Sequence, residues 1–148
     1  MTSDVSSADA SDVTPDVTVL VVDDQAPFRD AARAVVDRMT GFAIVAEAES
    51  GEAAVELVGA LHPQLVLMDI NMGGMDGVDG MDGIEATTQI ASRFPDTMVV
   101  LLSTYELADL PPSARTSGAA AYVNKDDFGG RALRRLWENA GDPAFRAR

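Results

Sequence analysis

The sequence predicts an α/β fold in which five parallel strands form a doubly wound sheet. Three observations support this prediction. Short runs of Val, Leu, Ile and Ala alternate with helical stretches, the runs are almost continuously apolar, and their spacing suits successive β-α-β units. A length of 148 residues favours one domain, which we place at residues 17–140.

The expected elements follow one another along the chain. The strands are near-continuous apolar runs at residues 17–22, 42–46, 65–68, 98–102 and 119–123. Prolines, glycines and one serine delimit the helices, because proline suits a first turn and serine suits an N-cap. The helices run from Pro27 to before Gly41, from after Ser50 to before Pro63, over 84–94, from near Pro111 to before Gly118, and over about 127–139.

Both ends of the chain are predicted to lie outside the domain. Residues 1–16 carry four Asp among Ser, Thr and Ala and no large apolar cluster, which is typical of a disordered acidic tail. Residues 141–148 are expected to form a C-terminal tail, and we expect no second domain after Asn139.

Composition excludes several classes of function. The 24 Asp and Glu residues outnumber the 11 Lys and Arg residues, which argues against nucleic acid or anionic membranes as partners of this chain alone. There is no cysteine, so disulfides, thiolate metal sites and cysteine nucleophiles are excluded. Neither a membrane-spanning run nor a secretory signal is present, and we expect a cytoplasmic protein.

Polar side chains follow four of the five predicted strands at the points where those strands end. Asp23 and Asp24 follow the first strand, Asp69 the third and Ser103 the fourth, and Lys125, the only lysine, lies just past the fifth. The carboxyl ends of parallel strands meet at one edge of the sheet, where such folds bind their ligands. We therefore expect three carboxylates, a hydroxyl and an amine to converge there.

Three neighbouring carboxylates repel one another unless a cation offsets their charge. A hard divalent ion with oxygen ligands, most naturally Mg²⁺, suits this set. We expect Asp24 and Asp69 to bind it directly, Asp23 to bind directly or through water, and a backbone carbonyl near Asn71 to add a ligand.

Mg²⁺ together with a lysine ammonium is the usual pair for stabilising a phosphoryl group in transfer. Asp69 lies on the central strand of the predicted sheet and is the natural carboxylate nucleophile for an acyl phosphate. Ser103 and Lys125 would then donate hydrogen bonds to the phosphoryl oxygens.

Four motifs in this order resemble the receiver domain of bacterial two-component response regulators, which has a flavodoxin-like fold. They are Val-Val-Asp23-Asp24, Leu-Met-Asp69-Ile-Asn-Met, Leu-Leu-Ser103 and Tyr122-Val-Asn-Lys125. The stretch from Val45 to Gly51 is similar to receivers that usually precede a helix-turn-helix DNA-binding domain.

The resemblance implies a phosphorelay protein and not an enzyme in the ordinary sense. A histidine kinase or phosphotransfer protein would phosphorylate Asp69, and the signal would pass by contact to a downstream protein, with a phosphorylation-dependent homodimer as one outcome. Ser103, Thr104 and Lys125 would bind the phosphoryl group while Tyr122 rotates inward. Asn71 and Tyr105 occupy positions where this family tunes the lifetime of the phosphorylated state.

Two features depart from the family pattern. A hexad is repeated in tandem at 74–79 and 80–85, which predicts an extended loop beside the site, because six extra residues would misphase a helix. The pair Pro111-Pro112 shortens the fourth helix, which belongs to the output face of the family. A pseudo-receiver, in which these features disable the switch, therefore stays open.

Two further alternatives stay open at this point. The chain could be the receiver part of a longer DNA-binding transcription regulator. A phosphohydrolase of the haloacid-dehalogenase type also uses a nucleophilic Asp on such a sheet. That class needs a second Asp two residues after the nucleophile, where this chain has Asn71.

Overall fold

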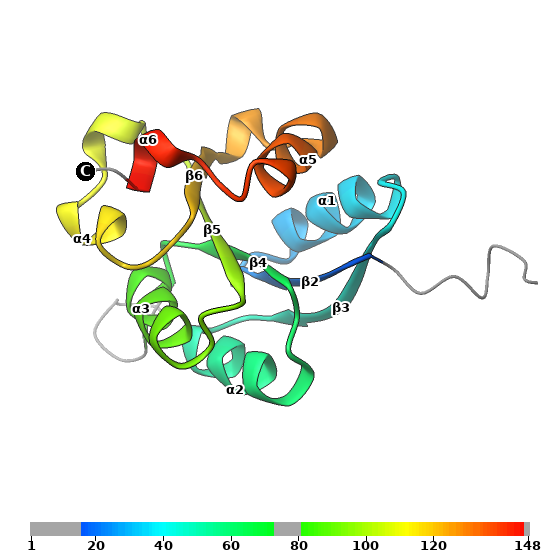
Figure 1. Cartoon of the computed structure of the whole chain (residues 1–148), viewed down its shortest axis with the longest axis horizontal. Helices are drawn as coiled ribbons and strands as arrows, with labels where there is room; N and C mark the ends of the chain where they lie inside the picture. Colours follow the sequence, from blue (N-terminus) through cyan, green and yellow to red (C-terminus); the bar gives the residue numbers. More distant parts are fainter. Residues whose placement is uncertain (1–15, 73–80, 147–148) are drawn as a thin grey trace, which may run out of the picture.

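The computed structural model describes residues 16–72 and 81–146, which form a central sheet covered by helices (Figure 1). The strands are β2 (Val17–Val22), β3 (Phe42–Ala48), β4 (Leu65–Asp69), β5 (Met98–Ser103) and β6 (Ala121–Asn124). Their order is β3-β2-β4-β5-β6, and every neighbouring pair is parallel. The predicted fold class is confirmed, and the strand bounds differ from the predicted ones by at most two residues.

Helices cover both faces of the sheet. They are α1 (Ala26–Asp37), α2 (Gly51–Leu61), α3 (Gly83–Arg93), α4 (Pro112–Arg115), α5 (Gly130–Glu138) and α6 (Pro143–Arg146), with short 3₁₀ turns η2 (Leu107–Asp109) and η3 (Lys125–Asp127). Helices α1 and α5 lie on one face, and α2 and α3 lie on the other (Figure 1).

The apolar side chains of the strands alternate between two buried layers. On β2, Leu20 and Val22 belong to the layer under α2 and α3, whereas Val19 and Val21 belong to the layer under α1 and α5. This alternation follows from the two-residue period of a strand. Because each strand is packed on both faces, its carboxyl end is held at a fixed place on the sheet edge.

The helix ends follow the local sequence signals. The Ser50 hydroxyl accepts the amide N–H of Ala53 at 3.1 Å, so the predicted N-cap of α2 is confirmed. The carboxylate of Asp82 caps α3 in the same way. Helix α4 begins at Pro112 and has four residues, in agreement with the short helix that the proline pair predicts.

The predicted start of the last helix is wrong by three residues. Helix α5 begins at Gly130 and not at Asp127, because residues 125–127 form the turn η3. In this turn the Asn124 side chain accepts the amide N–H of Asp126 at 2.9 Å, and Phe128 has an extended backbone. The chain therefore makes a separate turn after β6 before it enters the helix.

The segment expected to be a C-terminal tail is packed against the domain. It contains α6, whose Phe145 is 3% exposed and joins the layer under α2 and α3. The amide N–H of Asp142 donates to the carbonyl of Ala120 at 2.9 Å, and the Asp142 carboxylate accepts the amide N–H of Ala144. Residues 1–15, which hold nearly all of the predicted acidic tail, lie outside the described residues, as does most of the repeat, at 73–80. Most of the loop predicted for that repeat therefore also lies outside the described residues.

None of the helices in the described part of the chain is both long and apolar enough to span a membrane.

Candidate functional site

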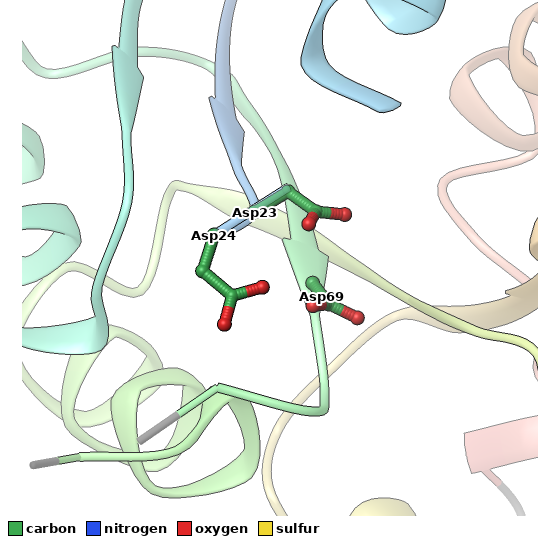
Figure 2. A group of neighbouring side chains, drawn as sticks. All are labelled: Asp23, Asp24 and Asp69. Carbon is green, nitrogen blue, oxygen red and sulfur yellow. The ribbon is translucent and has the colours of Figure 1, made fainter. Parts of the chain in front are cut away.

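The carboxyl ends of β2 and β4 bring three aspartates together. Asp23 and Asp24 directly follow β2, and Asp69 is the last residue of β4. The two strands are neighbours, with Val22 paired to Met68, so the residues that follow lie side by side. The three carboxylates offer oxygens within 4.8 Å of one another, and Figure 2 shows them grouped at this edge of the sheet.

The three carboxylates differ in exposure and in their hydrogen bonds. Asp23 is fully buried and Asp69 is 3% exposed, whereas Asp24 is exposed to solvent. Both oxygens of Asp23 have donors within the protein: Oδ1 accepts the amide N–H of Gln25 at 2.8 Å, and Oδ2 accepts Lys125 Nζ at 2.7 Å. Asp24 is therefore the carboxylate most accessible to an incoming ion.

Lys125 is the cation of this site. Its Nζ lies 3.3 Å from Asp69 Oδ1 in addition to its contact with Asp23, so one ammonium group bridges the two buried carboxylates. The same Nζ lies 4.6 Å from the centre of the Phe28 ring, a cation–π arrangement that covers the ammonium group with an apolar surface. The lysine predicted to complete the site is thus placed between two of its acids.

Burial and like charge act on Asp69 in the same direction. The pKa of Asp69 is raised from its ordinary 3.8 to about 6, mainly by burial and further by the negative charge of Asp23. Lys125 and the amide of Asn71 lower it, but by less. For Lys125, burial lowers the pKa, yet the hydrogen bond that Lys125 donates to Asp23 and the negative charges of both acids outweigh burial and leave the pKa raised. Lys125 therefore stays charged, whereas the charged form of Asp69 is destabilised by burial and by repulsion from Asp23.

A cavity of about 340 Å³ opens over the acids. Its lining residues include Asp24, Asp69 and Lys125, together with Asn71 and Thr104, which the sequence analysis also singled out. The amide N–H of Asn71 lies 3.4 Å from Asp69 Oδ1. The cavity gives a small charged ligand access to the carboxylate of Asp69.

Ser103 and the two tyrosines form a second cluster beside the acids. Ser103 ends β5 and is buried, and its Oγ lies 2.9 Å from the hydroxyl of Tyr122 and accepts the amide N–H of Tyr105 at 3.0 Å. The Tyr122 hydroxyl also contacts the carbonyl of Tyr105. Within residues 16–72 and 81–146, the Ser103 side chain forms hydrogen bonds with these tyrosines and not with the acids. The predicted site residues are therefore placed in two adjoining clusters.

The sequence analysis missed two side chains that support the acids, Phe28 and Arg29. Phe28 covers Lys125, and Arg29 Nη1 donates to the backbone carbonyl of Asp23 at 2.8 Å. Their residue types alone gave no signal. The available clue was their position, at the start of the helix that directly follows the aspartate pair.

Comparison with known proteins identifies the class of this fold and site. Residues 19–135 match the family model described as response regulator receiver domain. The chain belongs to this family, as the four sequence motifs indicated. Receivers are not enzymes in the classical sense, so the haloacid-dehalogenase alternative is set aside. The acidic triad is compatible with the divalent metal site that is typical of receivers.

The chain is similar to the receiver parts of longer regulators. It is 34% identical over 110 residues to the transcriptional regulatory protein DegU of Brevibacillus brevis, covering 74% of this chain and 44% of that protein. It is also 34% identical to the transcriptional regulatory protein YdfI of Bacillus subtilis, covering 73% of this chain and 47% of that protein. The chain thus spans about half the length of the curated relatives it matches.

Solved structures give the same result. The signal receiver domain of the putative response regulator NarL from Mycobacterium tuberculosis matches with a TM-score of 0.73 and 28% identity, over 85% of this chain and 97% of that one. A LuxR-family two-component response regulator from Aurantimonas sp. matches with a TM-score of 0.71 and 27% identity, over 86% and 85%. The predicted likeness to receivers of helix-turn-helix regulators is confirmed.

Proposed function

We propose that this chain is a phosphorelay receiver that accepts a phosphoryl group on Asp69 and signals by protein–protein contacts. One observation carries the proposal: Asp69 is a buried carboxylate, opens onto a cavity, and lies beside two further acids and the ammonium of Lys125. Receiver domains interact with histidine kinases. A histidine kinase or a phosphotransfer protein is therefore the proposed donor, in the cytoplasm.

The residues present fit a bound Mg²⁺. The donor set consists of oxygen atoms, the grouped acids carry more negative charge than Lys125 neutralises, and Asp24 is accessible from the cavity. Asp24, Asp69 and the backbone carbonyl of Asn71 would hold the ion directly. Asp23 already accepts two protein donors, so a water-mediated contact suits it better. The ion would offset the negative charge that gathers when a phosphoryl group approaches the acids.

In the transfer itself, an oxygen of Asp69 attacks the phosphorus of the donor's phosphohistidine. The new O–P bond forms as the P–N bond breaks, and the imidazole leaves with that electron pair and regains a proton from solvent. Lys125, already 3.3 Å from Asp69, is placed to donate to a phosphoryl oxygen. Thr104 lines the cavity and can offer its hydroxyl.

The second cluster supplies the proposed switch. Ser103 Oγ is held by Tyr122 and Tyr105, so binding a phosphoryl oxygen would require it to exchange one of these partners. Such an exchange would alter the contacts of Tyr122 on β6 and of the backbone at Tyr105. We propose that this change alters the surface beside α4 and β6, and that Asn71 and Tyr105 affect how long the phosphorylated state lasts.

Labelling with a small phosphodonor tests the proposal. Acetyl phosphate with Mg²⁺ should add one phosphoryl group to the wild-type chain, as read by intact mass, and chelation of Mg²⁺ should prevent it. Asp69→Ala should abolish the label, whereas Asp127→Ala, which removes an exposed acid outside the triad, should retain it. Equal labelling of wild type and Asp69→Ala would refute the proposal.

A second candidate function is the receiver part of a longer DNA-binding transcription regulator. The observation that favours it is the length of the relatives, of which this chain covers less than half. A genomic reading frame that continues past Arg148 into a helix-turn-helix would establish it. If phosphorylation of Asp69 leaves the NMR signals of Ser103 and Tyr122 unchanged, the chain would instead be a pseudo-receiver.

A further inference from the structure

Arg29 connects the acidic site to the neighbouring strand β3. Its side chain is 15% exposed and extends from α1 toward the end of β2. The guanidinium Nη1 donates to the backbone carbonyl of Asp23 at 2.8 Å, and Nε lies 3.2 Å from Glu47 Oε1 on β3. Glu47, an acid outside the triad, therefore holds the guanidinium in place while the guanidinium binds the backbone of Asp23, a member of the triad.

The carbonyl that Arg29 binds belongs to the peptide bond between Asp23 and Asp24. The amide N–H of Asp23 is bound separately, by the carbonyl of Ala48 on β3 at 3.0 Å. The backbone at Asp23 is thus fixed on both sides, by strand pairing at the N–H and by Arg29 at the C=O. The orientation of this one peptide unit determines where the two adjacent carboxylates point.

We propose that Arg29 is a positioning residue for the metal site and keeps the carboxylates of Asp23 and Asp24 in the arrangement that binds a divalent ion. Like the protein partners of metal ligands in general, it would act on the ion through a ligand-bearing segment without touching the ion. The inference rests on the proposed function in one respect, namely that the triad binds Mg²⁺.

Charge and positioning make opposite predictions for Arg29. A guanidinium near the triad repels Mg²⁺, so a purely electrostatic role means that its removal strengthens binding. A positioning role means that its removal weakens binding, because the peptide unit of Asp23 loses its hydrogen bond. The sign of the change in Mg²⁺ affinity therefore separates the two roles.

Arg33 provides a matched control on the same helix. It also pairs with Glu47, through Nε at 2.9 Å from Oε2 and through Nη2, and its side chain is 47% exposed. Among the described residues, the Arg33 side chain donates to Glu47 and not to Asp23. Arg33→Gln thus removes the same charge and the same acidic partner as Arg29→Gln, and it leaves the Asp23 carbonyl bound.

The experiment is a Mg²⁺ titration of the full chain, in which ¹⁵N NMR signals of the Gln25 and Asn71 amides report binding. We expect Arg29→Gln to weaken Mg²⁺ binding about 10-fold. Arg33→Gln should change it by no more than about twofold, as for an exposed ion pair. Arg29→Lys, which can keep a single hydrogen bond, should fall between wild type and Arg29→Gln. Thermal unfolding of each variant confirms that it is folded at the temperature of the titration.

A second measurement needs no metal. The amide N–H of Gln25 donates to Asp23 Oδ1, so its hydrogen exchange reports whether the Asp23 turn is held. We expect faster exchange at Gln25 in Arg29→Gln and wild-type exchange in Arg33→Gln. Unchanged exchange in folded Arg29→Gln would overturn the inference even before any Mg²⁺ is added.

Further outcomes overturn the inference in distinguishable ways. If Arg29→Gln binds Mg²⁺ as tightly as wild type or more tightly, the positioning role is wrong and the proposed function stands. If the two Gln variants lose affinity equally, loss of the Glu47 partnership explains the effect and the contact with Asp23 does not. If the wild-type chain fails to bind Mg²⁺, the metal site of the proposed function fails together with this inference.

Discussion

The acidic site and the edge of the sheet at β6 differ in the interactions that stabilise them. At the site, two buried aspartates and one exposed aspartate are held together by strand ends and by one lysine. At the β6 edge, which we define as β6 with α4 and α6, Phe145 is buried and Arg115 donates to its backbone carbonyl at 2.9 Å. The site is thus held together against its own electrostatic repulsion, whereas the edge is held together by apolar burial.

This difference makes substitutions in the two regions act in different directions. Truncating a buried side chain at the β6 edge leaves a cavity and destabilises the fold. At the site, the outcome depends on charge: removing the cation exposes the repulsion, and removing an acid relieves it. Four substitutions test this contrast, with expected effects that range from about 3–4 kcal/mol to about 1 kcal/mol of unfolding free energy.

Lys125→Met should give the largest loss. Without the ammonium, the buried carboxylates of Asp23 and Asp69 lose the cation that bridges them, and breaking a buried pair in this way costs about 3–4 kcal/mol of unfolding free energy. Urea denaturation at pH 8 without Mg²⁺ measures this loss of unfolding free energy.

Lower pH should recover part of the loss by protonating Asp69, and saturating Mg²⁺ should recover part by supplying positive charge. As a control, Arg131→Met removes an exposed cation on α5 and should have little effect. Similar losses in the two variants would contradict the view that the site depends on one cation.

Phe145→Ala should destabilise the chain by about 3 kcal/mol, the lower end of the range for a buried phenylalanine. Phe145 is 3% exposed and the centre of its ring lies 5.0 Å from the guanidinium carbon of Arg115, so truncation leaves both a cavity and an uncovered cation. Phe145 and Leu107 both line an existing cavity of about 590 Å³. The control is Leu107→Ala, which shortens a side chain of this lining at a residue that is 48% exposed. Urea denaturation of the pair measures the difference. If Phe145→Ala is as stable as Leu107→Ala, α6 contributes nothing to the fold and the β6 edge is not built by burial.

The sequence was sufficient to predict the sheet and the grouping of the acids. Apolar runs define the strands, and in a parallel sheet the topology alone brings the residues after the strands to one edge. Asp23, Asp24, Asp69 and Lys125 therefore converge where their sequence positions predicted. Their roles in metal binding and phosphoryl transfer stay predictions.

The features that sequence reasoning missed depend on long side chains or on packing between distant segments. Arg29 reaches the Asp23 carbonyl because Glu47, eighteen residues along the chain, holds its guanidinium in place. The helix around Phe145 is too short to show an apolar period, and it is stabilised by contacts with Arg115 and Ala120. The bond between Ser103 and Tyr122 depends on side-chain rotamers, which a sequence pattern does not specify.

Asp69→Asn should raise stability, in contrast to the two losses above. The pKa of Asp69 is about 6 in the folded chain against an ordinary 3.8, so the folded state binds more protons between these values. Stability without metal should therefore fall as pH rises from about 4 through 6. Removing the charge should stabilise the chain at pH 8 by about 1–2 kcal/mol and flatten this slope. Urea denaturation across the pH range measures both effects.

The control for this stabilisation is Asp24→Asn, which removes the exposed acid of the same triad. It should stabilise the metal-free chain less, since its carboxylate is not desolvated. Mg²⁺ should stabilise wild type more than either variant. A loss of stability in Asp69→Asn at pH 8 would mean that its contact with Lys125 outweighs its burial and its repulsion from Asp23.

Tyr122→Phe probes the place where the two regions meet and should have the smallest effect, a loss of about 1 kcal/mol for a hydroxyl that bonds within the protein. The ring packs against the same apolar layer as Phe145, while the hydroxyl lies 2.9 Å from Ser103 Oγ beside the acids. Burial raises the pKa of the Tyr122 phenol, although the hydrogen bond with Ser103 opposes this, so the hydroxyl is protonated at neutral pH. Tyr105→Phe, at a residue that is 44% exposed, is the control and should leave stability unchanged. Urea denaturation gives the stability, and NMR of the Ser103 amide shows whether the substitution changes the structure at the acidic site.

An altered Ser103 signal in Tyr122→Phe, with Phe145→Ala shifting the same signal, would show that the β6 edge and the acidic site are coupled through this one hydroxyl. If Phe145→Ala leaves the Ser103 signal unchanged while Tyr122→Phe alters it, the stabilities of the two regions are not coupled.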